Sequence, residues 1–63
     1  MIVHGSRYGW QTVLFEGDRR ACLNWIFDNC DVGDLVQKNG KWCGYAYFED
    51  SVGCVFVIRL DDF

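Results

Sequence analysis

One histidine and four cysteines are the residues of this chain whose types most directly suggest chemistry. Any Ser/His/Asp or Cys/His arrangement must use His4, the sole histidine, which lies close to the N-terminus. Cys22 and Cys30 are eight residues apart, which is about 12 Å along a helix and too far for both to bind one tetrahedral zinc ion. Cys43 and Cys54 are expected on opposite faces of neighbouring strands. We therefore predict no catalytic residue, no metal site and no cofactor.

The acidic residues fall mainly in predicted turns and at the C-terminal end, where a solvated charge is their ordinary role. The segment from Asp28 to Asp34 has the composition of a calcium loop, but it lacks the alternating carboxylates and the closing glutamate. We interpret it as a loop that ends a helix. Nine Asp/Glu against six Lys/Arg give a net charge of −3, which disfavours nucleic acid and anionic membranes as partners, because both are bound by clustered Lys/Arg.

Length and composition predict a single small domain over residues 1–63. The chain is 51% hydrophobic and has no proline, and a domain of this size buries only about 60% of the surface of its unfolded chain. The N-terminal residues do not have the basic and apolar segments of a secretory signal, and the apolar run from Val52 to Ile58 is too short to span a membrane. We expect a cytoplasmic protein with reduced cysteines.

The first half of the chain predicts a strand followed by a helix. Aromatic and β-branched residues favour a strand over residues 8–15, and residues 1–7 could add a short strand with a turn at Gly5-Ser6. Asp18 is the predicted N-cap of a helix over residues 19–29, whose apolar residues recur at helical spacing.

The second half predicts three antiparallel strands. Asn39-Gly40 is a strong two-residue hairpin signal, and it joins strands over residues 34–38 and 41–48. A turn over residues 49–53 then leads to a strand over residues 54–60. The predicted fold class is α+β with the order β-α-β-β-β, in which one helix packs on one face of an antiparallel sheet.

The hairpin turn also predicts the register. It pairs Lys38 with Lys41 and, further back, Val36 with Cys43 and Leu35 with Gly44. Because side chains alternate along a strand, one face, expected to meet the helix, carries Trp42, Gly44, Ala46, Phe48, Cys54, Phe56, Ile58 and Leu60. The other face carries Val36, Cys43, Tyr45, Tyr47, Val55, Val57 and Arg59. Either this second face stays uncovered, or the strand over residues 8–15 or the N-terminal segment folds across part of it.

A short motif on the predicted hairpin is similar to a known nucleic-acid-binding motif. The residues from Gly44 to Phe48 resemble the core of the RNP1 motif of RNA-recognition domains, in which alternate aromatics stack on bases. The resemblance implies that Tyr45 and Tyr47 would be the stacking residues. Cys43 replaces the basic residue of that motif, and Asp50 replaces its final aromatic residue.

The uncovered face is the predicted functional surface. Soluble monomers rarely expose a large contiguous apolar patch, so we expect a host protein or a second copy to bind there. The predicted partner-binding residues are Val36, Tyr45, Tyr47, Val55, Val57 and Arg59. In size and composition this acidic chain resembles the small inhibitors encoded by bacteriophages, such as anti-CRISPR proteins, which implies a non-enzymatic protein that occludes a functional surface in the host cytoplasm. The alternatives are a module that binds RNA or single-stranded DNA and a structural homodimer.

Overall fold

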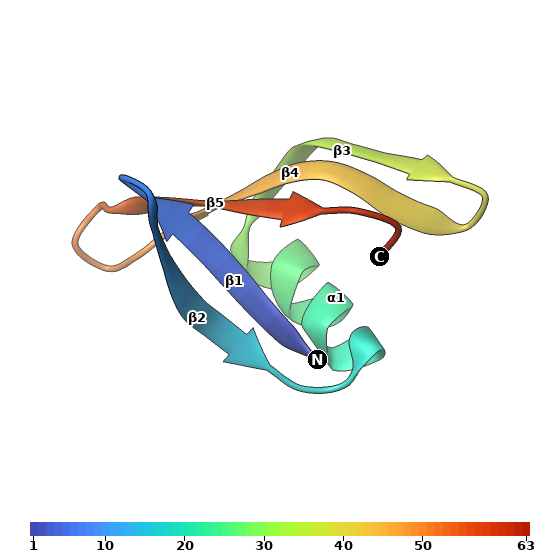
Figure 1. The fold of residues 1–63 in the computed structure, drawn as a ribbon, viewed down its shortest axis with the longest axis horizontal. Coiled ribbons are helices and arrows are strands. Elements are labelled where there is room, and N and C mark those ends of the chain that lie inside the picture. The colour runs from blue at the N-terminus through green and yellow to red at the C-terminus, as the bar shows by residue number, and fades with distance from the viewer.

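The computed structural model describes residues 1–63 as one helix and one five-stranded antiparallel sheet. The strands have the spatial order β2-β1-β5-β4-β3, so the first and last strands of the chain are neighbours at the centre. In Figure 1 the helix lies in the angle between the β1–β2 hairpin and the other three strands. The elements are β1 (Ile2–Arg7), β2 (Trp10–Glu16), α1 (Arg19–Asn29), β3 (Asp31–Lys38), β4 (Lys41–Glu49) and β5 (Val55–Leu60).

The N-terminal segment differs from the prediction, because it forms a complete hairpin. Strand β1 runs through Gly5-Ser6, so the turn predicted there is wrong. The actual turn is Tyr8-Gly9, with φ angles of 51° and 79°, nearly the same as the 51° and 76° of Asn39-Gly40. Both hairpins therefore have the positive φ angles that a type I′ turn requires. The predicted strand over residues 8–15 therefore begins two residues too early: tyrosine rarely adopts a positive φ, so its residue type does not indicate a turn.

The helix begins as predicted. The Asp18 side chain accepts a hydrogen bond from the Ala21 amide (N···O 2.7 Å), and the helix ends at Asn29. Cys30 is the C-cap, and β3 starts at the next residue, so the predicted loop up to Asp34 is wrong. Asp31 and Asp34 belong to β3 instead, and Asp28 and Asn29 to the last turn of the helix. No helix in the structure has the length and the hydropathy needed to cross a membrane.

The predicted register of the second hairpin is confirmed, including Lys38 with Lys41 and Leu35 with Gly44. The pairing shifts further along β3, between Asp31 and Asp34. Gly44 lies beside this irregularity with a φ of 119°, and a Cβ atom there would be 2.5 Å from the carbonyl oxygen of Asp34. Strand β4 can therefore approach β3 at this point only because residue 44 is glycine.

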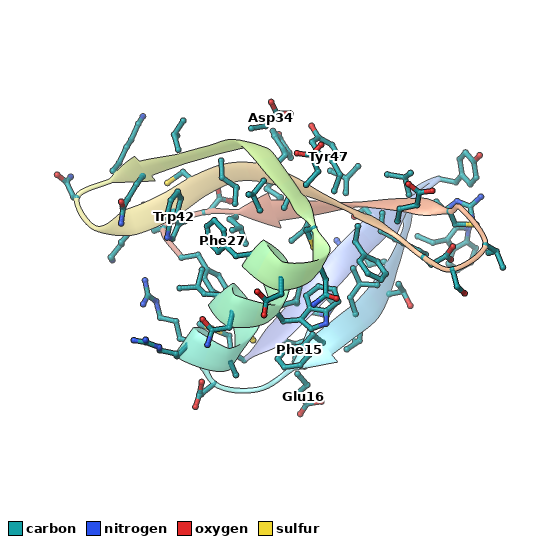
Figure 2. The ribbon with its side chains drawn as sticks, turned by 180° about the vertical axis from the view of Figure 1, so that it is seen from behind. Phe15, Glu16, Phe27, Asp34, Trp42 and Tyr47 are labelled. Carbon is teal, nitrogen blue, oxygen red and sulfur yellow. The ribbon has the colours of Figure 1, made fainter.

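The core lies between the helix and one face of the sheet. Cys22 and Ile26 of α1 are fully buried and form one cluster with residues from four strands. Aromatic rings extend this cluster: Trp25 lies 5.6 Å from Phe15 and 5.1 Å from Phe48, measured between ring centroids. Figure 2 shows another such pair, Phe27 and Trp42, between α1 and the sheet. The strand residues of the cluster are Val3, Leu35, Ala46, Ile58 and Leu60.

Candidate functional site

The face of the sheet opposite to α1 carries all six predicted partner-binding residues, and we call these six residues the open face. They come from three adjacent strands, and the register sets Tyr45 opposite Arg59 and Tyr47 opposite Val57. Val36, Tyr45 and Val55 are 52%, 46% and 47% exposed, which is unusual for large apolar side chains. The full set is Val36, Tyr45, Tyr47, Val55, Val57 and Arg59.

No other part of the chain crosses the open face. Strand β2 lies at the edge of the sheet, beside β1, so the alternative in which it folds across this face is wrong. Strand β1 extends the same sheet, with Ser6 paired to Val57. Cys54, which was predicted to begin the last strand, lies just before it, since β5 starts at Val55.

Two aspartates lie at the β3 side of the open face, and we call Asp31 and Asp34 the acidic edge. In the register Asp31 is paired with Tyr47, and Asp34 with Tyr45. The Tyr47 hydroxyl donates a hydrogen bond to Asp34 Oδ2 (O···O 2.8 Å), and Figure 2 shows both side chains on the side away from α1. This hydrogen bond, above all other causes, raises the pKa of Tyr47 from its ordinary value of 10.0.

The raised pKa of Tyr47 predicts a pH dependence. The folded protein holds this proton more tightly than the unfolded chain, so the contact stabilises the fold below pH 10 and is lost as the pH rises through the folded-state pKa. In an NMR-monitored titration, Asp34→Ala should lower the pKa of Tyr47 towards 10. An unchanged pKa in this variant would show that the hydrogen bond does not form in solution.

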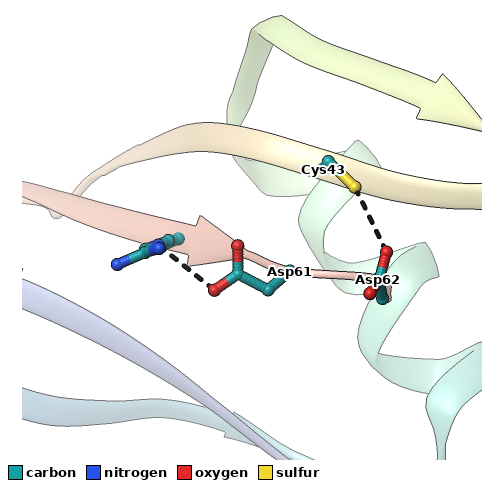
Figure 3. Close-up of polar contacts among 4 residues, drawn as sticks. Cys43, Asp61 and Asp62 are labelled. Carbon is teal, nitrogen blue, oxygen red and sulfur yellow. Dashed lines mark hydrogen bonds and ion pairs between the residues drawn. The ribbon is translucent and has the colours of Figure 1, made fainter.

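The C-terminal end of β5 holds the remaining polar contacts near the open face. Arg59 Nε lies 3.2 Å from Asp61 Oδ2, the one ion pair in the structure, and the Cys43 thiol donates to Asp62 Oδ1 at 3.7 Å (Figure 3). Asp61 therefore partly neutralises Arg59. The acidic edge meets no Lys or Arg, so its negative charge is available to a partner.

The residues considered for catalysis do not come together. His4 is exposed on β1, and all four cysteines are free thiols. Burial raises the pKa of the Cys30 thiol to about 11, which keeps it protonated at neutral pH and weakens it as a nucleophile. No three His, Cys, Asp or Glu side chains are grouped so that they could hold a metal ion.

The most exposed large side chains lie on two turns or directly next to one, and they were not identified from the sequence. Tyr8, Trp10 and Val52 are 87%, 80% and 81% exposed. The Arg7 guanidinium lies 4.9 Å from the centroid of the Tyr8 ring, a cation–π distance. The sequence does contain a signal for a hairpin at Tyr8-Gly9, since a segment of strand-forming residues lies on each side of it. The positive φ of Tyr8 could not be predicted from its residue type. The sequence offers Asp31 and Asp34 only as two of several acidic residues that could meet a basic partner; it does not place them beside Tyr45 and Tyr47, because it assigns Asp31 to a loop.

Tyr8 is strained where it lies, and this predicts a stabilising substitution. A tyrosine with φ of 51° is disfavoured by about 1 kcal/mol relative to asparagine, which tolerates this region. Tyr8→Asn should therefore raise the free energy of unfolding by about 1 kcal/mol, less a small loss from the contact with Arg7. Urea denaturation measures this, and a clear decrease in stability would mean that the turn has a different conformation.

Comparisons with known proteins do not identify the chain: no protein family, no curated protein and no solved structure matches it. Its function therefore has to be inferred from the open face and the acidic edge.

Proposed function

We propose that this protein is a non-enzymatic binding module that covers a basic surface of another protein with its open face, as small inhibitors of the phage-encoded type do. The observation that carries the proposal is an apolar and aromatic face, on three adjacent strands, that the chain leaves uncovered. The helix packs on the other face, so this one is free to bind.

The residue types of the open face support a protein partner. Tyrosine and arginine are over-represented among the residues that contribute most to binding in protein interfaces. Tyr45 and Tyr47 lie on the same strand, two residues apart, and Arg59 is paired with Tyr45 on the next strand. The valines around them supply apolar area that has to be covered for these contacts to exclude water.

The acidic edge indicates the charge of the partner. Asp31 and Asp34 are exposed, lie next to the two tyrosines in the register, and have no cationic partner within the chain. A surface with Lys or Arg beside an apolar patch would complement them. A second copy would instead add its own net charge of −3 to that of the first, so self-association through this face is disfavoured.

The same geometry argues against nucleic acid. Phosphates bound at Tyr45 and Tyr47 would lie close to the acidic edge, and Arg59, the one cation of the open face, is paired with Asp61. Binding of RNA or single-stranded DNA needs positive charge along the backbone path. We therefore favour a protein partner over RNA or single-stranded DNA.

Site-specific photo-crosslinking tests the proposal. The photoreactive residue p-benzoylphenylalanine replaces Val36 or Tyr45 on the open face, or the exposed Asn24 on α1 as a control. In cells that carry the gene, we expect one protein to be crosslinked from both open-face positions and not from Asn24. Crosslinking of the same protein from Asn24 alone, or of RNA from the open face, would contradict the proposal.

A further inference from the structure

The centre of the sheet is incompletely paired. Strands β1 and β5 share one pair of opposite residues, Ser6 with Val57. Each of the other three pairs of neighbouring strands has six such residue pairs. Continuing the antiparallel register would set His4 opposite Arg59 and Val3 opposite Leu60. Instead, the two strands diverge from their meeting point, as Figure 1 shows.

A cleft of about 290 Å³ lies where these pairs are missing. Its floor includes Val3, Ile58 and Leu60, which are buried, and its rim includes His4 and Arg59, which are exposed. The cleft runs beside residues 2–4 of β1, and three residues of extended chain span about 10 Å.

The walls of the cleft determine what it can bind. Each wall is the edge of a strand whose other edge is already paired, β1 with β2 and β5 with β4. Backbone groups that face the cleft have no strand partner, and an unpaired strand edge is a template for an extended segment of another chain. We propose that this cleft binds three to four residues of an extended polypeptide, inserted as a strand between β1 and β5.

The rim and the floor predict which segment fits. Side chains of an inserted strand alternate between the two faces of the sheet. Those directed at the floor would meet Val3, Ile58 and Leu60, which already belong to the packed core, so glycine or alanine is expected there. Those directed outward would lie beside His4 and Arg59, so an aspartate or glutamate is expected, in competition with Asp61.

This inference rests on the proposed function in one respect: the extended segment that enters the cleft would belong to the partner protein. The acidic residue meets Arg59 in the cleft, while the basic residues of the partner meet the acidic edge on β3. Binding of an isolated peptide does not require the tyrosines of the open face, so the two proposals are separable by experiment.

Hydrogen exchange on the protein alone is the first part of the test. We expect amides of β1 and β5 that face the cleft to exchange about tenfold or more faster than amides of β4, which is paired on both sides. Equally slow exchange on all three strands would show that the sheet is closed in solution and would overturn the proposal. Slow exchange of the cleft-facing amides that becomes faster when the protein is diluted would also overturn the proposal, because a second copy of the chain would then fill the cleft.

Selection from a displayed library of random octapeptides is the second part. We expect enriched peptides to alternate small and acidic residues, and the bound peptide to slow exchange of the amides that face the cleft. Arg59→Gln should weaken binding of the selected peptide about fivefold, and His4→Glu, which sets a negative charge beside the acidic residues of the peptide, should also weaken it. Arg7→Gln, at the opposite end of β1 from the cleft, is the matched control and should change nothing.

The remaining outcomes separate this inference from the proposed function. Peptide binding that survives Tyr45→Ser/Tyr47→Ser, while crosslinking to the partner is lost, supports both proposals. No enriched peptide, or a peptide that protects the open face instead of the cleft, overturns the inference and leaves the proposed function standing.

Discussion

Replacing Gly44 with alanine is expected to destabilise the fold strongly. The backbone φ of 119° is disfavoured for alanine, and the new Cβ would lie 2.5 Å from the backbone carbonyl oxygen of Asp34, a contact that the strands can relieve only by moving apart. We expect a loss of about 3 kcal/mol, measured by urea denaturation. A domain of this length has a total stability of about 3 to 9 kcal/mol, so the variant should lose about a third or more of its stability.

Gly9 provides the matched control for Gly44. It also has a positive φ, 79°, but a Cβ atom there would meet nothing within 4 Å. Gly9→Ala should therefore cost only the conformational penalty, about 1 kcal/mol. Equal losses in the two variants would mean that the close approach of β3 to Gly44 is absent in solution.

The double substitution Tyr45→Ser/Tyr47→Ser should remove binding to the partner and leave the fold intact. Truncating a tyrosine at the centre of an interface commonly reduces the binding free energy by about 2 kcal/mol. Loss of both tyrosines should therefore weaken the affinity by about 100-fold or more. Neither residue belongs to the core cluster, so we expect the stability to change by less than about 1 kcal/mol. Titration calorimetry with the crosslinked partner and urea denaturation measure the two effects.

Tyr8→Ser is the matched control for the double substitution, since it also removes an exposed tyrosine but lies outside the open face. It should leave the affinity within about twofold of the wild type. If Tyr8→Ser weakens binding as strongly as the double substitution, the contact surface is the turn and the open face is not the binding site. If the double variant unfolds, the assignment of the two faces is wrong.

The parts of the fold that could be predicted are those in which local chemistry determines geometry. Asn39-Gly40 tolerates the positive φ angles of its turn, and this turn alone determined the register from Lys38–Lys41 to Leu35–Gly44. From the register and the alternation of side chains, the two faces of β4 and β5 followed. The Asp18 cap marked the start of the helix for the same reason, because its carboxylate accepts a free amide of the first turn.

The parts that could not be predicted depend on contacts between distant segments or on strain. Tyr8 adopts a turn conformation that its residue type disfavours, so the first hairpin was placed incorrectly. The pairing of β1 with β5 joins the two ends of the chain, and no local pattern indicates it. Asp31 looks like a loop residue, and its place beside Tyr47 follows only from the shifted pairing of β3 with β4.

The solution mass of the wild type and of Tyr45→Ser/Tyr47→Ser, measured by light scattering over a wide range of concentrations, tests most directly whether the open face is kept for another protein. We expect both to be monomers of 7.3 kDa at every concentration, because each copy carries its own acidic edge and a net charge of −3. A wild-type dimer that the double substitution converts to a folded monomer would contradict the account, since the open face would then be an interface between copies of this chain.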